Sequence, residues 1–537
     1  MRTKLFLLLF LGALTLRGAA PESAPDKLRR LVKLPVMSFG AGVKFDTEHG
    51  FSMFNDRVDY VAEIAPLKKQ LTGGTEDAAR HYQLGNHYAE IADRLNAKRS
   101  FDKAVELYRK RAEVESSDGR VLAEFGRALW AARKMSECEN IFRQAVRVSP
   151  RESKCWIALG QLLDWQARQA LAPADANRHE SIAPEQLVAS VVQTKPSLDQ
   201  LSQAQKLLKE ADGCFDQAAA VAPQDPEPFV QRALHKSSRG YLEGIFGLIR
   251  GEPKEPEEVM KGMFTLASIP DLQEAARLSP TNYQAIATTA FFEAMFHRFQ
   301  HDKGAPNDWN FWNVLPESSR KSIQGAMTRL EDLGQNANPK LAAGALEGLA
   351  LIQALVVGDL TGGRTTLRRA VTVDPTREQA WDMLVAILAQ SETFDELQTV
   401  CEERVKKRDS ARNRVILAKT YEKLHQLGKA DQQIKAALNL ESGNMLAHLS
   451  QAALLLKRKD NSGLSQAKNH LDRAQQILTK SPRTKDTNQQ ATSLLLTSSL
   501  FYALKGDMNE ARQLAKQVIE RDKDNEDAKE ILAALGP

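Results

Sequence analysis

Residues 125–150 read FGRALWAARKMSECENIFRQAVRVSP, and the spacing within this stretch decides the fold. Small residues, one bulky apolar residue and a closing proline occur in a fixed order, at Gly126, Cys138, Phe142, Ala145 and Pro150. Apolar residues at three- and four-residue spacing predict two amphipathic helices. The small residues predict a close helix crossing. Proline ends the second helix because it cannot donate the next backbone hydrogen bond.

The same spacing returns along the chain. It is found again at Leu351, Gly363, Leu367, Ala370 and Pro375, and at Ala418, Ala430, Ile434 and Ala437, with Ser442 in the place of the proline. A first-helix pattern stands at Trp156, Leu159, Gly160 and Leu163. The recurrence resembles the tetratricopeptide repeat, a unit of about 34 residues with W-x2-L-G-x2-Y, A-x3-F and P. The resemblance implies an all-α fold, a right-handed superhelical solenoid of stacked antiparallel helix pairs.

One helix pair cannot bury its apolar face alone, so each pair stacks on a neighbour. On this basis we predict the domain organisation of the whole chain. It comprises a signal peptide at 1–20, an N-terminal arm or cap at 21–77, repeat units at 78–150, three units with inserts at 151–340, and further units with a capping helix at 341–537.

Length and charge limit the possible classes of protein. A chain of 537 residues is too long for one compact core. Lys and Arg total 73 against 68 Asp and Glu, a net charge of +5. This near-neutral balance argues against a nucleic-acid binder, which needs a concentrated basic face.

The N-terminal residues MRTKLFLLLFLGALTLRGAAP have a basic start, a short apolar run and small residues after it. This pattern is typical of a secretory signal peptide, and we expect the protein to be exported, periplasmic or secreted. An uncleaved helical anchor is the alternative. No later segment is interpreted as an integral membrane span.

Cys138, Cys155, Cys214 and Cys401 are too sparse for a disulfide scaffold. We expect free buried thiols in helix-packing positions. A disulfide between Cys138 and Cys155 is the alternative for an exported protein.

Three consecutive units depart from the repeat because long inserts separate their first and second helices. The inserts cover 164–200, 238–262 and 297–318, and the second helices are expected near 201–223, 265–280 and 318–335. Equivalent loops of stacked units emerge on one edge, so the inserts are predicted to form a lateral lobe. Three unrelated loops are the alternative.

The best catalytic-looking set is Glu293, His297 and His301, whose four-residue spacing puts them on one helix face as in metal sites. A solvated or hydrogen-bonded polar stripe is the alternative interpretation. No other catalytic motif is present, so we predict no enzymatic activity and no cofactor. The competing hypothesis is a metal-dependent or carbohydrate-handling activity within the 160–335 lobe.

The expected function is a non-enzymatic scaffold for a protein or peptide partner in an extracytoplasmic complex. The inward-facing positions implied by the resemblance, together with aromatic residues of the third insert, give these partner-binding candidates: Arg120, Arg127, Trp130, Lys154, Arg412, Lys419, Lys423, Trp309 and Trp312. Solvated surface charge is the alternative for each basic residue, and burial in the lobe is the alternative for the insert tryptophans. A self-assembling array is the third hypothesis.

Overall fold

The protein is an array of antiparallel helix pairs. The computed structural model describes residues 24–34, 44–46, 50–52, 60–72, 77–90, 94–171, 187–188, 191–192, 194–252, 256–301, 312–391, 393–458, 462–480, 485–523 and 525–536. Within these residues the elements are helices, apart from one antiparallel pair of short strands, β1 (Lys44–Asp46) and β2 (Gly50–Ser52). The predicted all-α fold of stacked helix pairs is confirmed. The predicted signal peptide lies outside the described residues.

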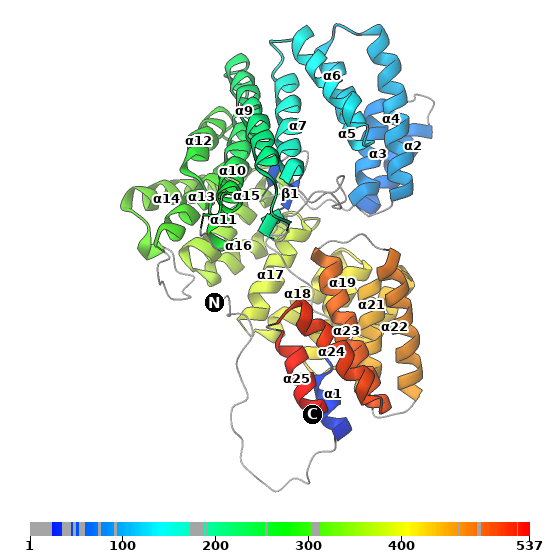
Figure 1. Cartoon of the computed structure of the whole chain (residues 1–537). Helices are drawn as coiled ribbons and strands as arrows, with labels where there is room; N and C mark the ends of the chain where they lie inside the picture. Colours follow the sequence, from blue (N-terminus) through cyan, green and yellow to red (C-terminus); the bar gives the residue numbers. More distant parts are fainter. Residues whose placement is uncertain are drawn as a thin grey trace. The chain divides into compact units, whose positions relative to one another are not determined.

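The chain divides into two compact parts. The central part is residues 40–380, and the terminal part is residues 1–39 with 381–537, so the boundary falls within α17 (Glu378–Gln390). In the central part, α2 (Tyr60–Thr72) precedes the pairs α3 (Ala78–Glu90) with α4 (Arg94–Val114), α5 (Gly119–Ala131) with α6 (Met135–Val148), α7 (Ser153–Leu171) with α9 (Leu198–Val221), α10 (Pro226–Ile249) with α12 (Ile269–Leu278), α13 (Tyr283–His301) with α14 (Glu317–Leu333), and α15 (Pro339–Ile352) with α16 (Leu360–Val373) (Figure 1).

The terminal part continues the same architecture. Its elements are α1 (Ala24–Leu31), α18 (Phe394–Lys407) after α17, the pairs α19 (Ala411–Lys423) with α20 (Leu427–Leu440), α21 (Met445–Lys457) with α22 (Ser462–Lys480), and α23 (Lys485–Lys505) with α24 (Met508–Arg521), and the capping helix α25 (Glu526–Leu535).

Each residue type in the repeat pattern has a packing reason. In the pair α5 and α6, Cys138, Phe142 and Ala145 are fully buried. A methyl group at Gly126 would lie 2.3 Å from Cε1 of Phe142, so only glycine lets the ring approach the first helix. In the pair α19 and α20, Ala430, Ile434 and Ala437 are likewise fully buried. The residues of the repeat pattern are therefore those that make the contacts between the two helices of a pair.

The three units with predicted inserts have long first helices. α7, α10 and α13 contain 19, 24 and 19 residues, whereas α5 and α19 contain 13. Much of the second insert is helix, since Tyr241, Ile245 and Phe246 lie on α10 and are buried. The central residues of the first and third inserts, 172–186 and 302–311, lie outside the described residues. The lateral lobe stays a prediction.

The predicted N-terminal arm separates into two regions with different neighbours. α2 packs on α3, and Leu67 shares a cluster with Leu84, Tyr88 and Phe101. Residues 24–34 belong instead to the terminal part, where α1 contacts α21, α23 and α25 (Figure 1).

One helical stretch in the described residues, Pro339–Val357, is long and apolar enough to cross a membrane. It combines α15 with a π-helical turn, Gln353–Val357. Because 72% of its most apolar window is buried inside the protein, it also fits the pattern of a core helix. The absence of a membrane span therefore stays a prediction.

The close helix crossing predicts opposite effects of one substitution at two glycines. Gly126→Ala places a methyl group against Phe142, and we expect it to cost about 1–3 kcal/mol of stability by overpacking. Gly213, in the interior of α9, has open space around its Cβ position. Gly213→Ala should stabilise the protein by up to about 1 kcal/mol through helix propensity. Urea unfolding followed by circular dichroism checks both signs. A stabilising Gly126→Ala would contradict the packing.

The four cysteines are predicted to be unreactive in the folded protein. All are buried free thiols, and burial raises the pKa of Cys155 and Cys214 to about 12 and of Cys401 to about 11. The thiolate is the reactive form. We therefore expect little labelling by a disulfide reagent at pH 7.5, and four labelled thiols after denaturation. Two missing thiols in the denatured protein would instead indicate a disulfide.

Candidate functional site

Polar side chains connect successive first helices in the central part. Nη2 of Arg127 on α5 donates to Oε1 of Gln161 on α7 at 3.4 Å. Nε2 of Gln161 donates to Oε1 of Gln231 on α10 at 2.9 Å, and Gln231 donates to Glu227 at 2.8 Å. We call Arg127, Gln161 and Gln231 the polar row. Gln161 and Gln231 are buried, and Arg127, a predicted partner-binding residue, is half-buried and bonded within the protein. Its role in partner binding stays a prediction.

The other candidates in the central part differ in exposure. Lys154 on α7 is exposed, and Arg120 on α5 has 68% of its side chain exposed while it pairs with Glu152. Trp130 is buried, with its ring 5.9 Å from that of Trp165 and 6.5 Å from that of Phe142. The prediction for Trp130 is thus corrected: this indole fills space between stacked helix pairs and is not a surface anchor. Arg120 and Lys154 remain accessible.

The candidates in the terminal part are mostly held by neighbours. Arg412 donates to both carboxylate oxygens of Asp382 at 2.9 and 3.0 Å, and the buried Arg404 pairs with the same carboxylate at 2.9 Å. Lys419 is half-buried, and burial lowers its pKa to about 8. Lys423 is exposed.

Of the two tryptophans predicted to bind a partner from the third insert, the structure describes one. Trp309 lies outside the described residues. Trp312 is half-buried in a 3-10 turn, Trp312–Val314, directly before α14. Its role in binding stays a prediction.

The predicted alternative metal site gains no support from its neighbours. Nε2 of His297 lies 3.0 Å from Oγ of Ser319, and the ring packs edge-on against Phe296. The side chain of His301 lies outside the described part of the structure. In that described part, no group of three or more His, Cys, Asp or Glu side chains is arranged to hold a metal ion.

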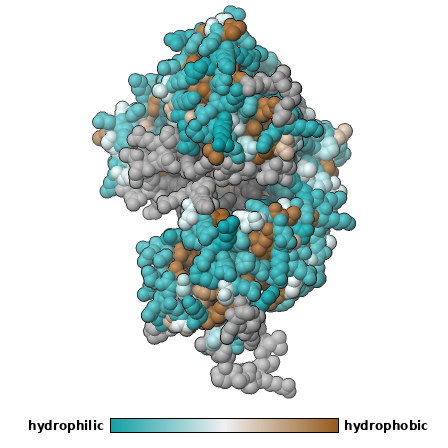
Figure 2. All heavy atoms as spheres, turned by 90° about the vertical axis from the view of Figure 1, so that its right-hand side faces the viewer, coloured by the Kyte–Doolittle hydropathy of each residue, from teal (hydrophilic) through white to brown (hydrophobic). Residues whose placement is uncertain are grey.

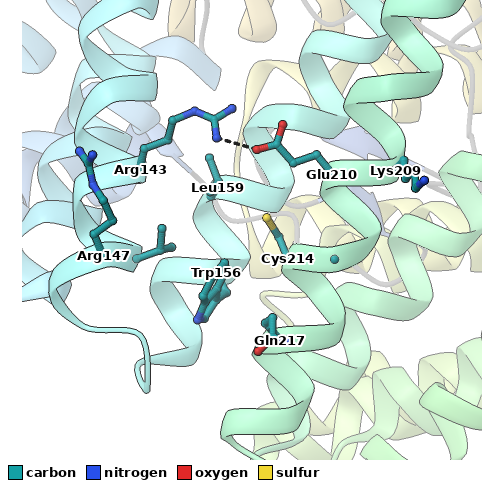
Figure 3. Close-up of a pocket in the computed structure, with 10 residues that line it drawn as sticks. Arg143, Arg147, Trp156, Leu159, Lys209, Glu210, Cys214 and Gln217 are labelled. Atoms are coloured by element: carbon teal, nitrogen blue, oxygen red, sulfur yellow. Dashed lines mark hydrogen bonds and ion pairs between the residues drawn. The ribbon is translucent and has the colours of Figure 1, made fainter.

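A groove of about 560 Å³ lies among α6, α7 and α9 (Figure 3). Figure 3 shows Arg143 reaching across it to Glu210, with 2.6 Å between Nη1 and Oε1. Nε1 of Trp156 donates to the carbonyl oxygen of Pro150 at 2.8 Å, which fixes the indole at the edge. Among the described residues, Arg147 and Lys209 of the lining have no ion-pair partner. The groove is thus partly apolar with a basic rim. Elsewhere, Figure 2 shows a largely hydrophilic face with scattered apolar residues.

A buried polar cluster between α7, α9 and α10 was not found by sequence reasoning. Nδ1 of His235 lies 2.9 Å from Asp164 and Nε2 lies 2.8 Å from Asp212, and the ring stacks on Phe215 at 4.7 Å. The partners are tens of residues apart, so no local spacing could have signalled the cluster.

Asp164 also pairs with Arg168 at 3.0 Å and accepts from Ser238 at 3.2 Å. Burial alone would raise the pKa of Asp164, but the charge of Arg168 and the bonds from His235 and Ser238 hold it below its ordinary value of 3.8. The cluster is closely packed, with a cavity of only about 20 Å³ beside it. Its geometry therefore fits a structural role better than a catalytic one.

The cluster predicts a pH-dependent loss of stability. Asp164→Asn leaves Arg168 and His235 buried without their carboxylate, and we expect a loss of about 3 kcal/mol at pH 7. Because the folded-state pKa is lowered, this stabilisation is present above the unfolded value and lost as the pH falls through the folded value. Urea unfolding at pH 7 and pH 3 should show the difference between wild type and variant shrinking. Asp216→Asn, at a carboxylate on α9 with 65% of its side chain exposed, is the control. Equal effects of the two variants would contradict the assignment.

No family model and no curated protein matches the chain. Among solved structures, yeast Tom70 is 15% identical over 88% of this chain and 92% of its own, with a TM-score of 0.37. A tetratricopeptide repeat protein from Parabacteroides merdae is 12% identical over 56% and 99%, with a TM-score of 0.31. The human IFIT1 dimer with PPP-AAAA is 15% identical over 88% and 97%, with a TM-score of 0.28.

These similarities are too low to indicate a ligand or a partner. The fold rests on the helix pairs themselves, which have the order, the small-residue crossings and the stacking of the tetratricopeptide pattern. In fold, the chain is a tetratricopeptide-like repeat protein.

Proposed function

We propose that the protein is an exported, non-enzymatic scaffold that binds a protein partner along the first-helix face of the central part. The observation that carries the proposal is the pair of exposed cationic residues Arg120 and Lys154, at the starts of the successive first helices α5 and α7. The polar row, whose Gln161 and Gln231 are buried, joins α5, α7 and α10 and so keeps these helices in a fixed order. Stacked helix pairs bury their apolar sides against one another, and the outer sides of successive first helices form a continuous surface on which a partner can bind.

The chemistry of this face suits an acidic partner surface. Arg120 and Lys154 project exposed cationic groups from α5 and α7, near the start of each helix. Exposed charges of one sign mainly steer association and select partners. The lateral lobe and Trp312 are a second proposed surface, on which aromatic side chains would act as anchors.

Export is supported by the sequence of the leader, since a basic start, a short apolar run and small residues suit a cleaved signal peptide. The partner then belongs to an extracytoplasmic complex, such as an envelope or secretion assembly. The near-neutral net charge favours a protein partner over nucleic acid.

Site-specific photo-crosslinking tests the proposal. A photoreactive residue at position 154 of α7 should give one dominant adduct in the exported fraction, identified by mass spectrometry. The same residue at the exposed Lys206, on the second helix α9, is the matched control and should give little of that adduct. Lys154→Glu should lower recovery of the partner about tenfold, which corresponds to about 1.4 kcal/mol.

Two results would contradict this assignment. One is equal crosslinking from positions 154 and 206, because the partner would then not prefer the first-helix face. The other is a chain that stays inside the cell with its leader uncleaved, because an extracytoplasmic complex requires export.

A further inference from the structure

The first-helix face of the terminal part already holds a helix, which comes from the N-terminal end of the same chain. α1 contacts α21, α23 and α25 (Figure 1). α19, α21 and α23 are first helices of successive pairs, α25 caps them, and neighbours in this series touch. α1 therefore lies against the face that these first helices form together, which we call the terminal groove.

α1 meets the terminal groove with one apolar side. Leu28, Val32 and Leu34 are 4%, 1% and 1% exposed. Lys27 and Arg30 of the same segment are exposed to solvent. Leu28 lies within α1, whereas Val32 and Leu34 follow its last residue, Leu31, so the buried apolar contacts continue from the helix into the segment directly after it. This is how an amphipathic helix binds in an apolar groove.

A charge contact fixes the end of the segment. Nζ of Lys33 lies 2.6 Å from Oδ1 of Asp527 and 3.8 Å from Oε2 of Glu530, both on α25. Lys33 stands between the buried Val32 and Leu34, so the acidic pair selects a basic residue at that place in an otherwise apolar sequence. On the groove side, Glu422 of α19 accepts from Lys457 of α21 at 2.5 Å.

The terminal groove also contains Lys419, whose pKa is affected by charges of α19, of α25 and of the N-terminal segment. Lys419 of α19 is half-buried, and the charges acting on it include Glu422, Asp527 and Lys33. Lys419 was among the residues predicted for partner binding, and the structure places it near the chain's own N-terminal segment.

We propose that the terminal groove is a recognition site for an amphipathic helix with a basic residue between its last two apolar contacts, and that residues 24–34 are such a ligand held within the same chain. A partner protein that presents a helix of this kind displaces α1 and takes its place. The surface differs from the one proposed in the central part, and the two proposals stand or fall separately.

Tethering explains why the internal helix competes well with outside helices. A segment linked to its own binding site acts at an effective concentration of the order of millimolar for a short flexible connection. An external helix must outcompete it, so its apparent affinity for the intact chain is weaker than for a chain whose groove is empty.

Peptide binding tests the proposal. The probe is a fluorescent peptide of residues 22–36 of this sequence, titrated into a chain of residues 40–537 and into the full chain, with binding followed by anisotropy. We expect saturable binding to the shortened chain and at least about tenfold weaker binding to the full chain. Because the shortened chain could lose structure, its helicity and unfolding transition are measured alongside.

A second form of the experiment keeps the whole chain. Leu28→Asp with Val32→Asp should release α1 without removing it, and the added wild-type peptide should then bind and raise the melting temperature. Failure of the peptide to bind either the folded shortened chain or this folded variant would overturn the proposal, because α1 would then be an inseparable part of the core.

Peptides that differ in one charged residue distinguish specific recognition from nonspecific hydrophobic binding. A Lys27→Glu peptide changes an exposed position and should bind like the wild type, whereas Lys33→Glu should bind at least about tenfold more weakly. Asp527→Lys in the shortened chain should restore part of the binding of the Lys33→Glu peptide. Equal binding of the two single-charge peptides would contradict selection by the acidic pair.

Discussion

The array depends on close helix crossings within its pairs. In the pairs α3 with α4, α5 with α6 and α7 with α9, an aromatic ring of the second helix lies against a glycine of the first helix. Phe142 lies over Gly126 in this way, and the ring of Phe101 lies over Gly85. The close approach brings two helices to a fixed distance and leaves each pair with an apolar side. That side becomes buried only when the next pair stacks on it. The repeated composition of the chain follows from this requirement.

Apolar contacts alone do not determine the order in which the helix pairs stack, because the pairs have similar apolar faces. Polar bonds between successive pairs supply that information. Buried or half-buried examples join Glu347 to Arg377, Asp382 to Arg412, and Glu422 to Lys457, each 30 to 35 residues apart. Removing one partner of a buried ion pair costs about 3–5 kcal/mol, so a shifted stacking order that separates such partners is strongly disfavoured. The polar row and the His235 cluster act in the same way, and this explains why so many predicted binding residues are engaged within the protein.

The sequence predicted the fold because the repeat pattern is local: every small or bulky position refers to a neighbour within the same helix pair. The second helices expected near 201–223, 265–280 and 318–335 agree with α9, α12 and α14 for the same reason. The binding candidates were less predictable. A projection onto inward positions gives the direction of a side chain but not its partners, so it did not show that Trp130 is buried beside Trp165 or that Arg412 is bonded to Asp382. His235 carried no signal, since its carboxylate partner Asp164 lies 71 residues away on another pair.

The placement of α1 shows most clearly where local patterns stop being informative. The segment KLRRLVKL has the spacing of a short amphipathic helix, but nothing in it identifies α25, 494 residues away, as the neighbour of Lys33. A solenoid built from sequential contacts has no need for such a link between its ends, because each pair is stabilised by its immediate neighbours. Stacking of the helix pairs does not require an apolar surface on the first-helix face. The terminal groove has one, and this surface holds α1. The internal helix covers this apolar surface and shields it from water. The residue types of the bound segment therefore indicate which kind of helix the terminal groove binds.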